Sequence, residues 1–331
     1  MNGRRAFFLM LFGALALALG ISVQPKPDLP PAESGQLAYP GLATQLGSAV
    51  SVEINGGGKS VTLMHQGDDA SANWVVAERG GYPADARKLR SVLVALGELR
   101  LYEPRTVDPS LYARLGVNNP QAEGATSTGI VVTDRVGRIM ASLIVGHRGV
   151  RARPGAPEQI YIRRTGEKNA WLAEGSLDVS PDPLAWLQRG ILDIKADQIA
   201  SVEIHRDGTT LSLRRGKDGK LALDTPPAGK LDDIRPIEVS QALDALTLVD
   251  VGSDALPGKP VGSVQYVTTD TQKVTVLLSQ DGDHLWARLA ASGVSPDKML
   301  LLANHVFELP SWRLDEMLPK AADFLKADPK K

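Results

Sequence analysis

Alternating hydrophobic and polar residues predict two β-hairpins of the same design, 150 residues apart in the chain. Ser51-Val52-Glu53-Ile54 recurs as Ser201-Val202-Glu203-Ile204, and each copy is followed by a glycine-containing turn and a second alternating segment. Successive side chains of a strand point to opposite faces of the sheet, so this alternation is typical of strands with one buried face. A third short apolar segment follows each hairpin, at residues 74–76 and 221–223.

A helix is predicted after each group of strands. In the first group, apolar residues at positions i, i+3, i+4 and i+7 form one helix face: Leu89, Val92, Leu93 and Leu96. Asp85 is expected to cap this helix by accepting hydrogen bonds from its free amide groups. Leu243 and Leu246 stand 150 residues after Leu93 and Leu96, and they predict an equivalent helix.

The correspondence continues along the chain with a decreasing offset. Residues 130–134 match residues 265–270 at an offset of 136, and Trp186 matches Trp312 at an offset of 126. Loop deletions in the second copy would produce this decrease, because loops tolerate deletions better than packed elements do. We therefore predict an α+β fold of two tandem homologous units, each an antiparallel sheet with an amphipathic helix, at residues 49–195 and 196–331. Two unrelated halves with similar hairpins are the alternative.

Uncharged residues at positions 6–23 follow Arg4 and Arg5, and they predict one N-terminal transmembrane helix within residues 1–23. A helix of this length spans about 27 Å, close to the hydrocarbon thickness of about 30 Å. Because basic residues mark the cytoplasmic end, the body is expected in the periplasm, tethered to the inner membrane. Ala14-Leu15-Ala16 resembles a signal cleavage site, so secretion to the periplasm after cleavage is the alternative. Residues 24–48 begin with several prolines and are expected to form a linker.

Composition agrees with a globular body and excludes several classes of function. Hydrophobic residues make up 43% of the 331 residues and charged residues 23%, as in ordinary soluble domains. The net charge of −1 lacks the broad basic field that nucleic-acid binding needs, so no nucleic-acid partner is expected. The absence of cysteine excludes disulfides, thiolate catalysis and cysteine metal sites.

No residue pattern in the chain predicts catalysis, a cofactor or a metal. Gly56-Gly57-Gly58-Lys59-Ser60 resembles a phosphate-binding loop, but Glu53 stands where that loop needs its first glycine, and a strand follows instead of a helix. The five histidines never reach the H-x-x-x-H spacing of a metal site, and no G-x-S-x-G nucleophile motif occurs. An uncharacterised hydrolase that uses scattered carboxylates is the least favoured alternative.

One local concentration of arginine is a candidate surface for a partner or a ligand. It consists of Arg148, Arg151, Arg153, Arg163 and Arg164. Glycine and proline among these residues predict a loop joining two strands, and such a loop could meet anionic lipid headgroups, an acidic polymer or a protein. A solvated hairpin is the alternative. Four tryptophans with apolar neighbours are assigned to core or inter-unit packing: Trp171, Trp186, Trp286 and Trp312.

Several short motifs follow one another in a specific order. They are Tyr39-Pro40-Gly41-Leu42, residues 74–85 with the turn Glu78-Arg79-Gly80-Gly81-Tyr82, and residues 111–117, 143–146, 160–164, 177–187 and 191–194. This order resembles the bacterial family called domain of unknown function 4340. The resemblance implies one N-terminal membrane segment, an exported body and, for some relatives, an association with auxiliary subunits of gliding-motility-type ABC transporters. It implies no catalytic residues. Pro226-Pro227 replaces the turn in the second half, so the role of that turn is not duplicated.

These observations favour a non-enzymatic, membrane-tethered exported adaptor or accessory module that works through protein contacts, with ABC-type transporter subunits as the expected partners. Edge strands and a groove between two sheet-bearing units would both serve for docking. A cell-envelope ligand-binding protein that uses the arginine loop is the second hypothesis.

Overall fold

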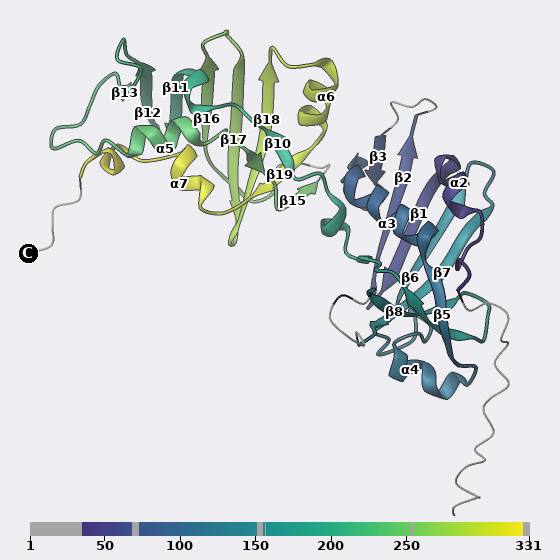
Figure 1. Ribbon diagram of the computed structural model, residues 1–331. Helices are drawn as coiled ribbons and strands as arrows, with labels where there is room; N and C mark the ends of the chain where they lie inside the picture. The colour runs from purple at the N-terminus through teal and green to yellow at the C-terminus, as the bar shows by residue number, and fades with distance from the viewer. Residues whose placement is uncertain (1–34, 68–72, 151–154, 156, 253–254, 327–331) are drawn as a thin grey trace, which may run out of the picture.

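The chain folds into two lobes, each built around one antiparallel sheet (Figure 1). The structure is a computed structural model that describes residues 35–67, 73–150, 155, 157–252 and 255–326. The predicted membrane segment at residues 6–23 and the start of the predicted linker lie outside the described residues. Within the part of the chain that the structure describes, no helix has both the length and the apolar composition needed to span a bilayer.

The first sheet has the strand order β4-β3-β2-β1-β6-β7-β8-β9-β5, and its neighbouring strands are antiparallel. Its strands are β1 (Ala49–Gly56), β2 (Lys59–Gln66), β3 (Asn73–Val76), β4 (Tyr82–Pro83), β5 (Arg100–Thr106), β6 (Thr128–Asp134), β7 (Ile139–Arg148), β8 (Gln159–Arg164) and β9 (Ala170–Glu174). Gly57 and Gly58 have φ angles of 56° and 75° and form the turn between β1 and β2. This segment is therefore the predicted hairpin turn.

The second sheet has the strand order β13-β12-β11-β16-β17-β18-β19-β15, and its neighbouring strands are again antiparallel. Its strands are β11 (Ile199–Arg206), β12 (Thr209–Arg215), β13 (Leu221–Leu223), β15 (Asp250–Gly252), β16 (Lys259–Thr268), β17 (Lys273–Asp281), β18 (His284–Ser292) and β19 (Val306–Leu309). The prediction of antiparallel sheets with few helices is therefore confirmed.

The two sheets have the same strand order when β1 is matched with β11. The first of these strands lies between β2 and β6, and the second lies between β12 and β16. A register shift also recurs at the same place, between Ala49 and Ser51 in β1 and between Ile199 and Ser201 in β11. Among the described strands, β4 at the edge of the first sheet has no counterpart in the second.

The strand pairing corrects one part of the sequence comparison. In the first sheet, Val132 lies opposite Val52. In the second, Tyr266 lies opposite Val202, so these strands correspond at an offset of 134 residues and not 136. A shift by two residues leaves every side chain on the same face of a strand, so the alternation in the sequence could not reveal it.

The first predicted helix is confirmed, and the second is shorter than predicted. The helix α3 (Ala86–Glu98) buries its four predicted apolar residues, and the Asp85 carboxylate accepts hydrogen bonds from two amides of the first turn. The helix α5 (Arg235–Gln241) ends before Leu243, and Leu246 lies in β14 (Leu246–Thr247). The positive φ of 45° at Ala245 is incompatible with a continuing right-handed helix. Both leucines are nevertheless buried in the core.

Short elements complete the described structure. They are α2 (Leu42–Gln45), α4 (Tyr112–Leu115), α6 (Pro296–Asn304), α7 (Arg313–Met317), β10 (Gly190–Leu192), which pairs with β14, and the 3-10 helices η1 (Leu46–Ser48), η2 (Ala77–Arg79), η3 (Pro109–Leu111), η4 (Pro183–Trp186), η5 (Ala196–Gln198) and η6 (Ala321–Phe324).

Residues 35–48, which form the end of the predicted linker, pack against the first sheet. The Ala38 amide donates a hydrogen bond to the Leu99 carbonyl. The Tyr39 hydroxyl donates to the Ser142 carbonyl at 2.5 Å and accepts from the Ser142 amide at 3.2 Å. Burial raises the pKa of Tyr39 to about 12, so this hydroxyl keeps its proton at neutral pH. The folded body therefore begins before residue 49.

Each sheet has an inner face that forms the main core. The helix α3 contributes Leu96 to this core in the first lobe, and α5 and α7 contribute Val239 and Met317 in the second. The first sheet has a smaller cluster on its outer face, made of Tyr112, Val117, Ile144 and Ala170. Because Ile144 lies between two residues of the main core on β7, its side chain points to the opposite face.

The four tryptophans have different environments. Trp171 and Trp186 are fully buried, as predicted. Trp286 is half-buried. Trp312 is 54% exposed, so its assignment to core or inter-unit packing is wrong. Its ring lies against the Arg313 guanidinium, 4.2 Å from the ring centroid, and this stacking satisfies an indole that has no core neighbours around it.

Candidate functional site

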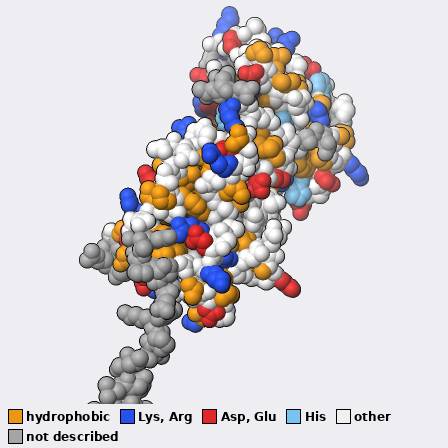
Figure 2. Space-filling model, turned by 90° about the vertical axis from the view of Figure 1, so that its right-hand side faces the viewer, with side chains coloured by type: hydrophobic (Ala, Val, Ile, Leu, Met, Phe, Trp, Pro, Cys, Tyr) orange, Lys and Arg blue, Asp and Glu red, His pale blue; other side chains and the backbone are white. Residues whose placement is uncertain are grey.

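The structure divides the five candidate arginines among different places. Arg151 and Arg153 lie outside the described residues. Arg148 ends β7, whereas Arg163 and Arg164 end β8. Because Arg148 lies opposite Ile160, three residues of β8, or about 10 Å, separate it from the position of Arg163. On the face that Figure 2 shows, basic and acidic side chains are interspersed over both lobes.

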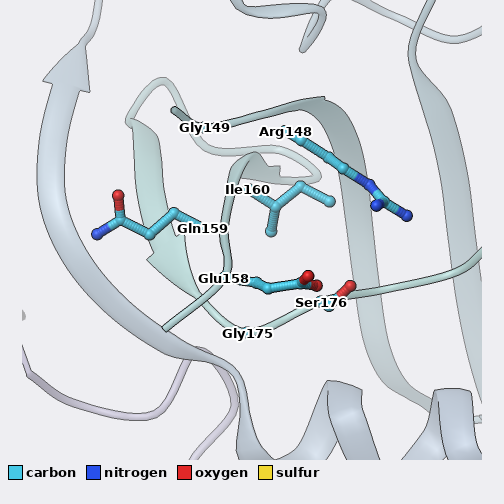
Figure 3. Close-up of a pocket in the computed structure, with 7 residues that line it drawn as sticks. All are labelled: Arg148, Gly149, Glu158, Gln159, Ile160, Gly175 and Ser176. Atoms are coloured by element: carbon cyan, nitrogen blue, oxygen red, sulfur yellow. The ribbon is translucent and has the colours of Figure 1, made fainter. Parts of the chain in front are cut away.

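Arg148 lines a small pocket at the ends of β7 and β8 (Figure 3). The pocket has a volume of about 180 Å³, and its other lining residues are Gly149, Glu158, Gln159, Ile160, Gly175 and Ser176. Figure 3 shows the Arg148 and Gln159 side chains extending away from each other on either side of Ile160. A side chain at Gly149 would meet Leu172 at 2.9 Å, so close packing fixes this wall. A guanidinium and a carboxylate beside glycine backbone suit a small polar ligand.

The other two described arginines join parts of the first lobe. Arg163 donates to the Val117 carbonyl at 2.9 Å, and its guanidinium lies 4.6 Å from the centre of the Tyr112 ring. Arg164 forms an ion pair with Glu167 at 2.9 Å and donates to a backbone carbonyl of the segment before α2. The structure therefore gives these two side chains a role in the framework.

Two of the recognised motifs meet on the outer face of the first sheet. Gly116 has a φ of 66° and lies directly below the His147 ring, where a Cβ would be 2.7 Å from a ring carbon. A Cβ at Gly146 would lie 2.9 Å from the Gly116 carbonyl oxygen and closer still to that of Leu115. Glycine at both positions thus allows α4 to approach β7.

The turn at residues 78–82 contacts the second lobe. Gly80 and Gly81 have φ angles of 63° and 73°, as predicted for a tight turn. Arg79 binds Asp250 of β15 through two hydrogen bonds, Nε to Oδ1 at 2.6 Å and Nη2 to Oδ2 at 3.2 Å. The two side chains expose only 25% and 22% of their surface. A two-point pair of this kind fixes orientation as well as distance.

An aromatic cluster lies beside this ion pair. Tyr82 is buried, and its ring meets the edges of His305 and Phe307 with centroid distances of 5.3 and 6.1 Å. Such edge-to-face pairs stabilise beyond the area that they bury. Burial raises the pKa of Tyr82 to about 12. Since Tyr82 belongs to the first sheet and its two neighbours surround the start of β19, the cluster joins the lobes.

The chain crosses between the lobes at Gln188 and Arg189. The Gln188 amide donates to the Pro83 carbonyl in the first lobe, at 3.0 Å. The next carbonyl, that of Arg189, accepts from the Leu248 amide in the second lobe, also at 3.0 Å. The Arg189 guanidinium donates to the carbonyls of Leu248 and Val249. We call these contacts, with the ion pair of Arg79 and the Tyr82 cluster, the joint.

The outer face of the second sheet differs from that of the first. Across β6, β7 and β8, strand pairing aligns Gly129, Ile144 and Arg163. Across β16, β17 and β18, it aligns Ser263, Leu277 and Arg288 at the equivalent places. Ile144 is 5% exposed, whereas Leu277 is 46% exposed. We call the outward side chains of these second strands the open face: Ser263, Gln265, Thr275, Leu277, Trp286 and Arg288.

The length of one connection explains the difference. In the first lobe, residues 107–127 connect β5 to β6 and include η3 and α4, which cover Ile144. In the second lobe, the equivalent connection from β15 to β16 is residues 253–258. Among the described residues, the second lobe has no helix at the place of α4. The decreasing offset in the sequence therefore reflects the loss of this cover.

A charged pair borders the open face. His284 Nδ1 lies 2.6 Å from Glu308 Oε1, and Glu308 is the cross-strand neighbour of Trp286. This hydrogen bond raises the pKa of His284 above its ordinary value of about 6.5. No group of three or more His, Asp or Glu residues in the described ranges is arranged to hold a metal ion.

A family model described as domain of unknown function (DUF4340) matches residues 74–262. The match runs from β3 across the joint into β16. The chain belongs to the DUF4340 family. No curated protein and no solved structure matches the chain. The DUF4340 match includes both Arg79 and Asp250, so it contains the ion pair of the joint.

Neither the joint nor the open face was predicted. Arg79 and Asp250 are 171 positions apart, and no local pattern connects them. One available signal was the Pro226-Pro227 replacement, because a turn needed once between two lobes has no use in the second. The other was the loss of offset between the helices and the following strands, which indicated the missing cover.

Proposed function

We propose that the protein is a non-enzymatic, membrane-tethered accessory module of the cell envelope that acts through protein contacts beside an ABC-type transporter of the gliding-motility type. Residues 6–23 would anchor it in the inner membrane and place the body in the periplasm. Cleavage after a signal peptide would instead release the same body into the periplasm.

The contrast between Ile144 and Leu277 carries this proposal. Equivalent strand positions are covered in one sheet and exposed in the other. The open face combines a tryptophan, a leucine and an arginine, and these are residue types suited to protein interfaces, where Trp and Arg are enriched at the buried centre. A surface with this composition supports binding of a protein more than catalysis on a small molecule.

The joint supports the same function. An accessory module must hold its binding surfaces in a defined relation to each other. The two-point Arg79–Asp250 pair and the Tyr82–His305 contact restrain the lobes at one place, and the chain itself crosses there. The arrangement suits a scaffold whose lobes present separate surfaces.

We also infer that the lobes arose by tandem duplication of one α+β unit, with units close to residues 49–195 and 196–331. The equal strand order and the recurring register shift in β1 and β11 support this inference. An experimental structure tests it by superposition of β1–β3 and β6–β9 on β11–β13 and β16–β19. Lobes that superimpose no better than unrelated antiparallel sheets would exclude a common origin.

The function is tested by chemical crosslinking in intact cells that express the full chain with a C-terminal affinity tag. Transporter permease or ATPase subunits should be enriched in the purified adducts. The control replaces residues 1–34 by a signal peptide known to be cleaved, so that the body is periplasmic but untethered. Recovery of the same abundant envelope proteins from both forms would contradict an accessory role at a transporter.

The Arg148 pocket favours a second candidate function, binding of a small acidic envelope ligand. Arg148→Glu should then abolish retention of radiolabelled acidic saccharides by the purified full chain. Arg135→Glu changes an exposed turn away from this pocket and serves as the matched control. Equal retention by the wild type and Arg148→Glu would remove the pocket from consideration.

A further inference from the structure

The first lobe shows which chemistry covers the outer face of such a sheet. Tyr112 of α4 lies over the Arg163 guanidinium at 4.6 Å, and Val117 lies in the same apolar cluster as Ile144. The ring uses the cation–π geometry that guanidinium groups favour, and the aliphatic side chains remove Ile144 from water. One short apolar segment with one aromatic residue is thus sufficient as a cover.

The second sheet presents the equivalent row without this cover. Leu277 stands at the place of Ile144, and Arg288 stands at the place of Arg163, one strand further on. Trp286 adds a half-buried ring two residues before Arg288 on the same face. The residues that need a cover in the first lobe are therefore repeated in chemical type in the second.

The geometry points to a partner protein that lays a short apolar segment with one aromatic side chain on the open face, in the way that residues 111–117 cover the first sheet. The aromatic ring would lie over Arg288, and aliphatic side chains would lie over Leu277. This inference rests on the proposed function and names its contact surface and the chemistry of its partner.

A second copy of this chain does not supply this segment. In each copy, Tyr112 and Val117 are already 8% and 0% exposed against their own sheet. The Tyr112 hydroxyl also donates to the Lys168 carbonyl at 2.5 Å. Withdrawing the segment to cover another copy would expose as much apolar surface as it buries, so a different protein is the expected occupant.

The experiment places the photoreactive residue p-benzoylphenylalanine at Thr275, inside the open face, in the full chain in its membrane. A protein adduct should form, and its crosslinked peptide should contain an aromatic residue within a short apolar run. Leu277→Asp should reduce the adduct at least tenfold without changing the melting temperature, because Leu277 is already half exposed. Leu300→Asp, at an exposed leucine on α6, is the matched control and should leave the adduct unchanged.

A second measurement uses a defined probe, a fluorescent peptide with the sequence of residues 108–118. The purified full chain should bind it, Leu277→Asp should bind it at least tenfold more weakly, and a peptide with Tyr112→Ala should also bind at least tenfold more weakly. Equal binding by Leu277→Asp, or a crosslinked peptide without an aromatic residue, would overturn the inference. Transporter subunits that are still recovered from Leu277→Asp cells would overturn the surface alone, whereas their absence from wild-type cells contradicts the proposed function.

Discussion

The guanidinium of Arg79 and the carboxylate of Asp250 form a two-point ion pair across 171 positions of the chain. Arg79 lies in the turn before the edge strand of the first sheet, and Asp250 begins the edge strand of the second. The pair therefore joins two sheets edge to edge, and it depends on a turn that occurs only in the first lobe. Its strength determines how firmly the lobes are held together.

Removing this pair should weaken the joint. We expect Arg79→Ala and Asp250→Ala each to lower the free energy of unfolding by about 1–2 kcal/mol, because charge-assisted hydrogen bonds at largely buried side chains are lost. A double-mutant cycle in urea measures the coupling. The matched pair is Lys59 and Asp182, whose side chains are 61% and 33% exposed and should couple by less than about 0.5 kcal/mol. Equal coupling energies for the two pairs would contradict a special role for the joint.

The Tyr82 ring should matter more than its hydroxyl. Tyr82→Phe keeps the contacts with His305 and Phe307 and should cost less than about 1 kcal/mol, whereas Tyr82→Ala should cost about 3–5 kcal/mol because it leaves a cavity between the lobes. Denaturant unfolding measures both values. Limited proteolysis should also show faster cleavage near Gln188 in Tyr82→Ala. A protease pattern equal to that of the wild type would show that the cluster does not hold the crossing segment.

Glycine is required at position 146. We expect Gly146→Ala to lower the free energy of unfolding by about 1–3 kcal/mol, because the new methyl group meets the backbone of Leu115 and Gly116 and forces α4 away from β7. Gly190→Ala is the control, since no atom lies within 4 Å of its added Cβ and its φ is not in the left-handed region. Thermal unfolding of the two variants gives the comparison. Equal melting temperatures would mean that the close approach is relaxed in solution.

His284 should titrate above its ordinary pKa. Its hydrogen bond with Glu308 stabilises the imidazolium, so the contribution of this pair to folding is complete below about pH 6.5 and is lost as the pH rises through the higher pKa of the folded state. An NMR titration of the His284 ring measures this pKa. Glu308→Gln should lower it, while Glu203→Gln, on a distant strand of the same sheet, should leave it unchanged. A pKa that does not respond to Glu308→Gln would exclude this cause.

Local patterns in the sequence predicted the elements that depend on nearby residues. The hairpin that starts at Ser51, its copy at Ser201, the turn at Gly80 and the helix cap at Asp85 all rest on interactions within a few positions. Family membership was also predicted, from motifs that are short but ordered. These features follow from alternation, glycine φ angles and amide capping.

The failures have equally specific causes. The offset of 136 failed because a strand shifted by two residues keeps its inward face, and the helix at Leu246 failed because a buried leucine is also compatible with an edge strand. Trp312 was placed in the core from apolar neighbours alone, although its ring lies on Arg313 at the surface. The arginines were grouped by sequence proximity, while alternation along β8 sends Arg163 and Arg164 to different partners.

The Glu-Arg-Gly-Gly-Tyr turn also limits how far this architecture can be extended. The second lobe carries Pro226-Pro227 where the first has that turn, so it lacks the arginine and the tyrosine with which a third lobe would be fastened. A longer array of the same building block would therefore need a new adhesive end. The molecule is a closed pair, and its size is set by one segment of five residues.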